Sequence, residues 1–178
     1  MQINLTKFKR KPKLSEFLNL QENFVLNSSP VKDLNHLSKS LESGKSVKLN
    51  SNPEKLNFLI LEFNQSKKSL IQVLHILKIK KLEPNLAYET FNSGKDTFRF
   101  RLIYQINELV SNIEIAKIYQ FLYETTKELI HPHFFKNPNA IVLGTNKKVF
   151  ISKNLNFSNL KEFSKKSKPY ILKNLAEN

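Results

Sequence analysis

The spacing of apolar residues predicts alternating strands and helices through the middle of the chain. The segment LNFLILEF at 56–63 is short and apolar, which indicates a buried strand. Apolar residues then recur three and four positions apart, so we expect a helix with Ser66 as its N-cap and Pro84 at its end. The segments at 85–91 and 98–106 are typical of two strands, and the polar connection between them is rich in turn-forming residues.

A second helix and two more strands follow. Ser111 and Glu114 have the spacing of a capping box, which predicts the start of a long helix with an inward apolar face. Strands are expected at 140–145 and 148–152, so the predicted order over residues 56–145 is β-α-β-β-α-β. This order is typical of the ferredoxin-like fold, an α+β class (RRM-like, primase-like) in which an antiparallel sheet carries both helices on one face. The other face of such a sheet is expected to be free for a ligand.

The two ends of the chain are more basic than its middle. Residues 1–13 carry five basic side chains and no acid, and we expect this arm to be unstructured. A short helix is predicted over 30–41, a strand over 46–50, and a lysine-rich helix over 158–175. The predicted division is a basic arm with a short helix at 1–45, a core at 46–157 and a basic C-terminal helix at 158–178.

Composition narrows the class of function. The chain has 178 residues, with 29 lysines and arginines against 15 acidic residues, and a formal net charge of +14. This excess indicates a polyanion partner, nucleic acid foremost, although AT-rich coding also supplies lysines and would leave a merely solvated basic surface. The absence of cysteine excludes disulfides and thiolate zinc sites. The sequence contains neither an apolar run long enough for a membrane span nor a secretory signal, so a cytoplasmic protein without membrane contact is expected.

Two of the three arginines lie close together on a predicted strand. Arg99 and Arg101 are two positions apart, so their side chains share one face, while Phe98 and Phe100 point to the other. A guanidinium binds phosphate or carboxylate with two parallel hydrogen bonds, which favours a role in phosphate contact. The alternative is that the arginines pair with acids on neighbouring strands, such as Glu62 or Glu89.

Two pairs of polar positions can be considered as metal ligands, one ending the first central strand and one following the second long helix. Glu62 and Asn64 share a face at the end of the first central strand, where two acids would form a divalent metal site, but an amide ligates metal weakly. His131 and His133 resemble the paired histidines of rolling-circle nickases. Because Pro132 fits a central strand poorly, we interpret them instead as residues in a loop at a helix end. Phenylalanines on the strands are expected to be core residues rather than base-stacking platforms.

The order of these motifs resembles the primase-polymerase domain of the archaeo-eukaryotic type found in phage and plasmid replication proteins. The resemblance extends over residues 46–151. In that family an apolar strand ends in Asp-x-Asp, and here LILEFN presents Glu62 and Asn64. A strand ending in Tyr-x-Thr-Phe is matched by YETF at 88–91, and a strand rich in Phe and Arg is matched by FRFR at 98–101.

The chain departs from the pattern of that family at its catalytic positions. Glu62 replaces the first acid, the amide of Asn64 replaces the second, and Lys95 stands at the histidine of the turn. His131 and Ala140 stand where the resemblance implies an acid and an arginine. Losing this many polar groups should abolish two-metal phosphoryl transfer, so the resemblance implies a primase-like core with an incomplete metal site.

The sequence therefore predicts a nucleic-acid-binding, replication-associated protein of a plasmid or phage, with DNA favoured over RNA and a replication protein as a further candidate partner. No cofactor is expected to be required, although Mg²⁺ or Mn²⁺ would serve an active form. The alternatives are a divergent but active primase or polymerase, and an RNA-binding or protein-interaction module. The predicted phosphate contacts are Lys95, Arg99, Arg101, Lys147 and Lys148; Glu62 and Asn64 are vestigial catalytic positions, and Glu62 is the one candidate metal ligand.

Overall fold

The computed structural model describes residues 1–49, 58–106, 112–131, 140–152, 161–162 and 165. The predicted helix over 158–175 and the capping residue Ser111 fall outside these ranges, apart from a few helical residues near 161. None of the helices in the described ranges combines the length and apolar character needed to cross a bilayer.

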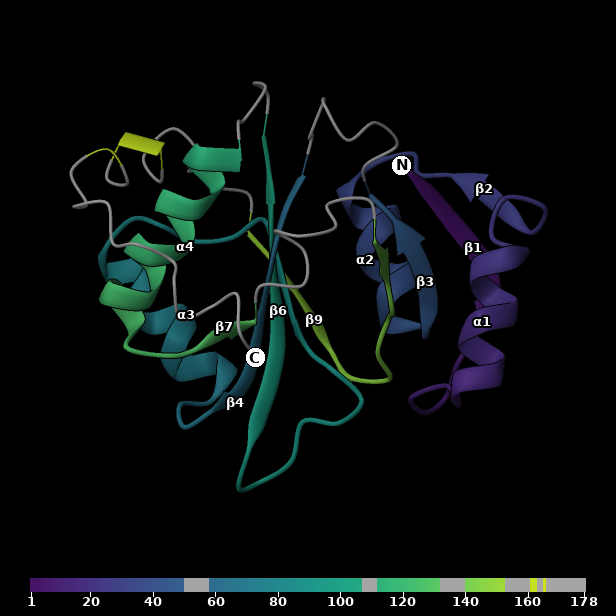
Figure 1. The fold of residues 1–178 in the computed structure, drawn as a ribbon, viewed down its shortest axis with the longest axis horizontal. Helices are drawn as coiled ribbons and strands as arrows, with labels where there is room; N and C mark the ends of the chain where they lie inside the picture. The colour runs from purple at the N-terminus through teal and green to yellow at the C-terminus, as the bar shows by residue number, and fades with distance from the viewer. Residues whose placement is uncertain (50–57, 107–111, 132–139, 153–160, 163–164, 166–178) are drawn as a thin grey trace.

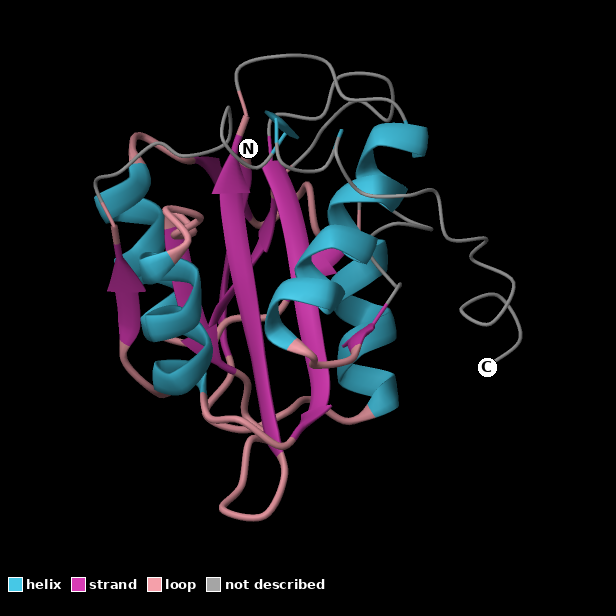
Figure 2. Cartoon of the chain, turned by 90° about the vertical axis from the view of Figure 1, so that its left-hand side faces the viewer, coloured by secondary structure: helices cyan, strands magenta, loops and turns pink. Residues whose placement is uncertain are grey.

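A five-stranded antiparallel sheet forms the centre of the molecule, with strands in the order β7-β4-β6-β5-β9. Its two longest strands, β4 and β6, run side by side, and α3 and α4 cover one face (Figures 1 and 2). The predicted α+β class and β-α-β-β-α-β order are confirmed. The elements are β4 (Phe58–Ser66), α3 (Leu70–Ile79), β5 (Leu86–Glu89), β6 (Phe98–Gln105), α4 (Asn112–Thr126), β7 (Ile130–His131) and β9 (Val149–Ile151).

The strand that closes this order is not the predicted one. The segment over 140–145 contributes only the short strand β8 (Ile141–Val142), which pairs in a different sheet. The closing strand is β7, because the chain turns immediately after α4 at Lys127, which has a left-handed φ of 56°, and buries Ile130 beside β4. The interpretation of His131 as a loop residue at a helix end is therefore wrong, since His131 lies in this strand.

Alternation along β4 and β6 separates two cores. Leu59, Leu61 and Phe63 face α3 and α4, and the ring of Phe63 stacks on that of Phe100 at 4.7 Å between centroids. The expectation that the phenylalanines of these strands are core residues is confirmed, with Phe98 partly buried. Ile60, whose side chain points to the opposite face from those of Leu59 and Leu61, belongs to the second core.

The N-terminal residues build a second sheet on the opposite side of the central one (Figure 1). Its order is β2-β1-β3-β8, and all pairs are antiparallel. Its elements and the helices beside it are β1 (Gln2–Lys7), α1 (Leu14–Glu22), β2 (Ser28–Pro30), α2 (Leu34–Glu42) and β3 (Lys45–Lys48), together with β8.

The expectation of an unstructured N-terminal arm is wrong. Ile3 is fully buried, and the amide of Asn4, also buried, donates a hydrogen bond to the carbonyl of Phe24. The density of lysines after residue 6 concealed this short alternating strand. By contrast, the helix and the strand predicted at 30–41 and 46–50 correspond to α2 and β3.

The second core covers only part of the face that was predicted to be free. Ile60, Tyr88 and Ile103 on the central sheet pack against apolar residues of the N-terminal sheet and α2, including Leu37 and Val47. Beyond Ile60 the alternation on this face changes from apolar to polar, at Glu62 and Asn64. The polar end of this face, where Glu62 and Asn64 are only partly buried, therefore lies directly beside a tightly packed core.

Gly144, which follows β8, packs tightly against the backbone at the end of α2 and the start of β3. A Cβ atom at Gly144 would lie 2.4 Å from the carbonyl oxygen of Lys45 and 2.5 Å from that of Leu41, distances that require the backbone to move. The next residue, Thr145, donates its N–H to the same Leu41 carbonyl at 2.7 Å. Glycine is thus required here by close packing.

We expect Gly144→Ala to lower the free energy of unfolding by about 1–3 kcal/mol, the usual cost of overpacking. Gly94→Ala is the matched control, because a Cβ atom at Gly94 meets nothing within 4 Å. The control should stay within about 0.5 kcal/mol of wild type in urea denaturation. Equal stability of the two variants would contradict the packing argument.

Glu128 connects the end of β4 to the start of α3. Its carboxylate is 5% exposed and accepts hydrogen bonds from the Ser66 hydroxyl at 2.7 Å, the Lys67 N–H at 2.9 Å and the Lys68 ammonium at 2.8 Å. Ser66 is therefore a strand residue that binds Glu128, and the N-cap of α3 is Ser69 rather than the predicted Ser66. Burial alone would raise the pKa of Glu128, but these hydrogen bonds outweigh it and lower that pKa below its ordinary value.

Because the pKa of Glu128 is lower in the folded state than in the unfolded chain, the carboxylate adds stability above the unfolded pKa of about 4.3. That contribution is lost as the pH falls through the folded pKa. We expect Glu128→Gln to be less stable than wild type at pH 7 and the difference to shrink as the pH approaches 3. Urea midpoints at a series of pH values measure it, and a pH-independent difference would refute the assignment.

Candidate functional site

Four side chains form a row across the polar end of the central sheet. Glu62 on β4 lies opposite His131 on β7 and opposite Arg101 on β6, and Arg101 lies opposite Tyr88 on β5. Residues directly opposite each other on antiparallel strands project from the same face. The register therefore brings an acid, a histidine, an arginine and a tyrosine together from four strands.

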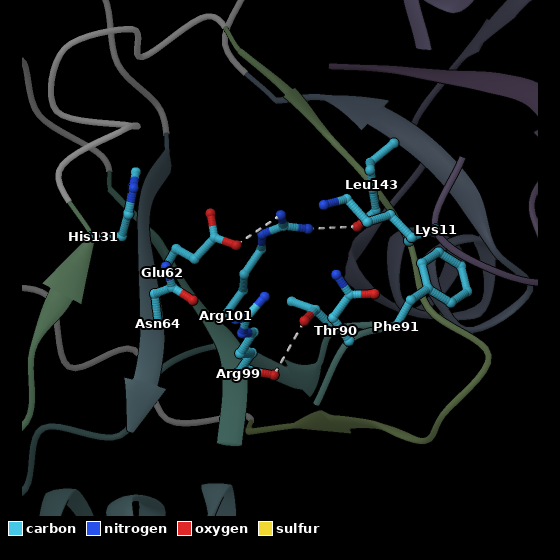
Figure 3. Close-up of a pocket in the computed structure, with 11 residues that line it drawn as sticks. Lys11, Glu62, Asn64, Thr90, Phe91, Arg99, Arg101, His131 and Leu143 are labelled. Atoms are coloured by element: carbon cyan, nitrogen blue, oxygen red, sulfur yellow. Dashed lines mark hydrogen bonds and ion pairs between the residues drawn. The ribbon is translucent and has the colours of Figure 1, made fainter. Parts of the chain in front are cut away.

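Arg101 is held at the centre of this row by three partners (Figure 3). One terminal nitrogen, Nη2, donates to Glu62 Oε1 at 3.0 Å, and the other, Nη1, donates to the carbonyl of Leu143 at 2.9 Å. Nη1 also lies 3.4 Å from the hydroxyl of Tyr88, which itself donates to the Leu143 carbonyl at 2.9 Å. For Arg101, the structure therefore supports the alternative that was left open, pairing with Glu62 on a neighbouring strand.

The ion pair between Arg101 and Glu62 is largely shielded from water. The side chains are 11% and 21% exposed. Burial by itself would lower the pKa of Arg101, but the neighbouring Tyr88 and Glu62 raise it above its usual value. The guanidinium therefore stays charged. Burial also raises the pKa of Tyr88, which keeps its hydroxyl protonated as a donor.

A pocket of about 200 Å³ opens beside this ion pair. Glu62 and Asn64 come from β4 and the two arginines from β6, so the two pairs of polar residues predicted to share a strand face converge in one concavity. His131 lies at the far side of Glu62 in Figure 3. The lining residues are Lys11, Glu62, Asn64, Thr90, Phe91, Asn92, Arg99, Arg101, His131, Leu143 and Gly144.

Arg99 differs from Arg101 in having an unpartnered side chain. Its backbone is fixed, since the N–H donates to the Ser93 hydroxyl at 3.1 Å and the carbonyl accepts from the Thr90 N–H at 2.9 Å. The Nε of Arg99 is buried without a hydrogen-bond partner, and in the described part of the chain its guanidinium forms no ion pair. This cation is therefore available to a ligand.

The three lysines predicted to contact phosphate lie outside the pocket. Lys147 donates to Glu89 Oε2 at 2.8 Å and to the carbonyl of Ser93 at 2.9 Å, so it fixes the connection that precedes β6. Lys148 is exposed, with its ammonium 5.9 Å from the centre of the Phe150 ring, and Lys95 is exposed in the same connection. The site as predicted is thus divided between a pocket with the arginines and a surface with the lysines.

Two functional candidates in the pocket were not singled out from the sequence. Lys11 belongs to the segment expected to be unstructured, and it reaches the pocket because β1 and α1 fix the chain on either side of it. Phe91 lies two residues after β5, within the YETF motif. Its position just after a strand was the one feature of the sequence that could have indicated a place in the pocket.

The residues present do not fit a divalent metal. The carboxylate of Glu62 is bound by a charged guanidinium, and the neighbouring ligand position holds the neutral amide of Asn64. Across the described ranges no three His, Cys, Asp or Glu side chains gather closely enough to hold an ion. A divalent cation next to Glu62 would be repelled by Arg101 and would have too few anionic ligands.

Comparison with protein-family models and with curated proteins finds no match. Among solved structures, the chain is similar to the catalytic domain of primase RepB' in complex with initiator DNA. The two sequences are 10% identical, the alignment covers 93% of this chain and 86% of that one, and the TM-score is 0.41. What the pocket can bind is therefore inferred from the side chains that line it.

The two arginines of the pocket should differ sharply in their effect on stability. Arg101→Ala leaves the shielded carboxylate of Glu62 without its cation and removes one of the two donors to the Leu143 carbonyl, so we expect it to lower the free energy of unfolding by about 3 kcal/mol. Arg99→Ala removes a side chain without a bonded partner and should cost less than about 1 kcal/mol. Urea denaturation of both variants measures this, and equal losses would contradict the assigned geometry.

Proposed function

We propose that this protein binds nucleic acid, with the pocket beside Arg101 receiving a backbone phosphate. The observation that carries the proposal is the unpartnered guanidinium of Arg99 lining a pocket in a chain of net charge +14. A guanidinium binds a phosphate through two parallel hydrogen bonds, and burial in a concave site strengthens such bonds.

The size of the pocket favours a small anionic group, such as one phosphate of a polymer, over a complete drug-sized molecule. Its volume of about 200 Å³ is below the roughly 300–1,000 Å³ typical of pockets that enclose drug-sized molecules. A phosphate is small enough, and the rest of a polymer would extend over the surrounding surface. Lys11 adds a second cation at the rim, and the amide of Asn64 can add a neutral donor.

An aromatic side chain and exposed lysines extend the proposed contact beyond one phosphate. Phe91 lines the same pocket and is partly exposed, so its ring can stack on a base next to the bound phosphate. Lys95 and Lys148 are exposed, and we propose that they contact neighbouring phosphates electrostatically. A ring beside a backbone-binding cation suits a single strand, whose bases are unstacked.

DNA is the ligand that we favour, in the replication of a plasmid or phage. This part of the proposal is supported by the ordered motifs that resemble a primase-polymerase domain. Metal-dependent nucleotidyl transfer is not favoured, because Glu62 is bound by Arg101 and its neighbour is the amide of Asn64. RNA and a protein partner remain outcomes of the binding test below.

We expect Arg99→Ala to weaken binding of a labelled single-stranded oligonucleotide at least about tenfold, the effect of losing one charge-assisted hydrogen bond. Lys11→Ala should weaken binding less, and each variant should reduce the slope of log K against log salt by about one. Fluorescence anisotropy at several salt concentrations, with DNA and RNA of the same sequence, gives both quantities.

Lys78→Ala is the matched control, since Lys78 is exposed on α3, behind the opposite face of the sheet. Its affinity and salt slope should stay close to wild type. The proposal fails if wild type binds neither nucleic acid at low salt, or if Arg99→Ala behaves like Lys78→Ala. Tighter binding of RNA than of DNA would overturn the choice of DNA alone.

A further inference from the structure

The charge balance in the pocket depends on a buried cation that the protein supplies itself. Glu62 and Asn64 occupy the strand end where anionic ligands for a divalent ion would be expected, yet the carboxylate of Glu62 is bound by Arg101 at 3.0 Å. A bare carboxylate lining the pocket would repel an incoming phosphate. A site that binds phosphate must therefore neutralise Glu62.

Arg101 is fixed well enough to perform this role permanently. Its terminal nitrogens bind groups from three separate segments, namely Glu62 on β4, Tyr88 on β5 and the Leu143 carbonyl after β8. The side chain is 11% exposed, so swinging out to solvent would break several shielded hydrogen bonds at once. No comparable set of bonds holds the guanidinium of Arg99.

We propose that the guanidinium of Arg101 takes the place of a divalent cation, so that the pocket binds a nucleic-acid phosphate without metal. This inference rests on the proposed function. Arg101 neutralises Glu62, and Arg99 together with Lys11 then gives the pocket a net positive charge for the phosphate. These separate roles explain why Arg99 and Arg101, on the same face of one strand, have such different surroundings.

The experiment tests whether a metal ion can replace the missing guanidinium. Binding of a single-stranded DNA oligonucleotide is measured in EDTA and in Mn²⁺ at matched ionic strength, and each affinity is divided by that of wild type in the same buffer. This ratio cancels the general competition of Mn²⁺ for DNA phosphates. The variants are Arg101→Ala, Arg99→Ala and the double variant Glu62→Gln/Arg101→Ala.

In EDTA we expect Arg101→Ala to bind at least about tenfold more weakly than wild type, because Glu62 is left as an uncompensated charge. Mn²⁺ should restore most of that loss, since with Arg101 removed the ion can be held jointly by the carboxylate of Glu62 and the phosphate of the DNA, which together supply the anionic ligands that the protein alone lacks. Arg99→Ala should show no rescue by Mn²⁺. The double variant should bind better than Arg101→Ala in EDTA and should not respond to the metal.

Wild type provides a further test, in which the binding of DNA in EDTA does not depend on the folding of any variant. Its binding should persist in EDTA, and Mn²⁺ titrations followed by electron paramagnetic resonance should show no bound ion that disappears in Glu62→Gln. Metal binding that requires Glu62, or DNA binding lost in EDTA and restored by Mn²⁺, would overturn the inference while leaving the proposed function intact. Absence of DNA binding by wild type under every condition would instead refute the proposed function.

Discussion

The contact on which the polar half of this molecule depends is the set of hydrogen bonds made by Arg101. Its guanidinium joins Glu62 of the central sheet to the Leu143 carbonyl, which follows the last strand of the N-terminal sheet. A buried ion pair contributes little net stability on its own, but breaking it leaves uncompensated polar groups. The arrangement therefore specifies one relative position of the two sheets where apolar packing ends.

The pocket exists because the alternation on one strand face changes character midway. Ile60 on β4 and Ile103 on β6 belong to a core shared by both sheets. On the same face, Glu62 follows Ile60 by two residues and Arg101 precedes Ile103 by two, and both border the pocket. The apolar core fixes the positions of the strands. Where this core ends, Arg101 supplies a partner for the carboxylate of Glu62. Arg99, two residues before Arg101 and near the start of β6, is then presented to the pocket by a strand rather than by a loop.

Much of the central sheet could be predicted from the sequence because its signals are local. The apolar segment around Leu61 and the alternation around Arg99 each specify a strand through the residues they contain. β1 and β7 could not be predicted in this way. The signal of β1 is obscured by the lysines that follow it, and β7 has only two residues, whose place is decided by pairing with Glu62 and Phe63 across the sheet.

The candidate site shows the same limit. Strand periodicity put Arg99 and Arg101 on one face and Glu62 with Asn64 on another strand end, and all four line the pocket. Periodicity carries no information on which arginine is bound by Glu62, because that depends on register. Periodicity also could not predict that Lys11 lines the pocket. Lys11 is about fifty residues away from Glu62 in the sequence, and the tertiary structure alone brings the two together.

One short stretch of chain links the two sheets mechanically. β8 pairs with β3 in the N-terminal sheet, β9 pairs with β5 in the central sheet, and fewer than ten residues separate them. The Leu143 carbonyl that receives Arg101 and the tightly packed Gly144 both lie within that stretch. Because Leu143 and Gly144 also line the pocket, a change in the angle between the two sheets would alter the shape of the pocket itself.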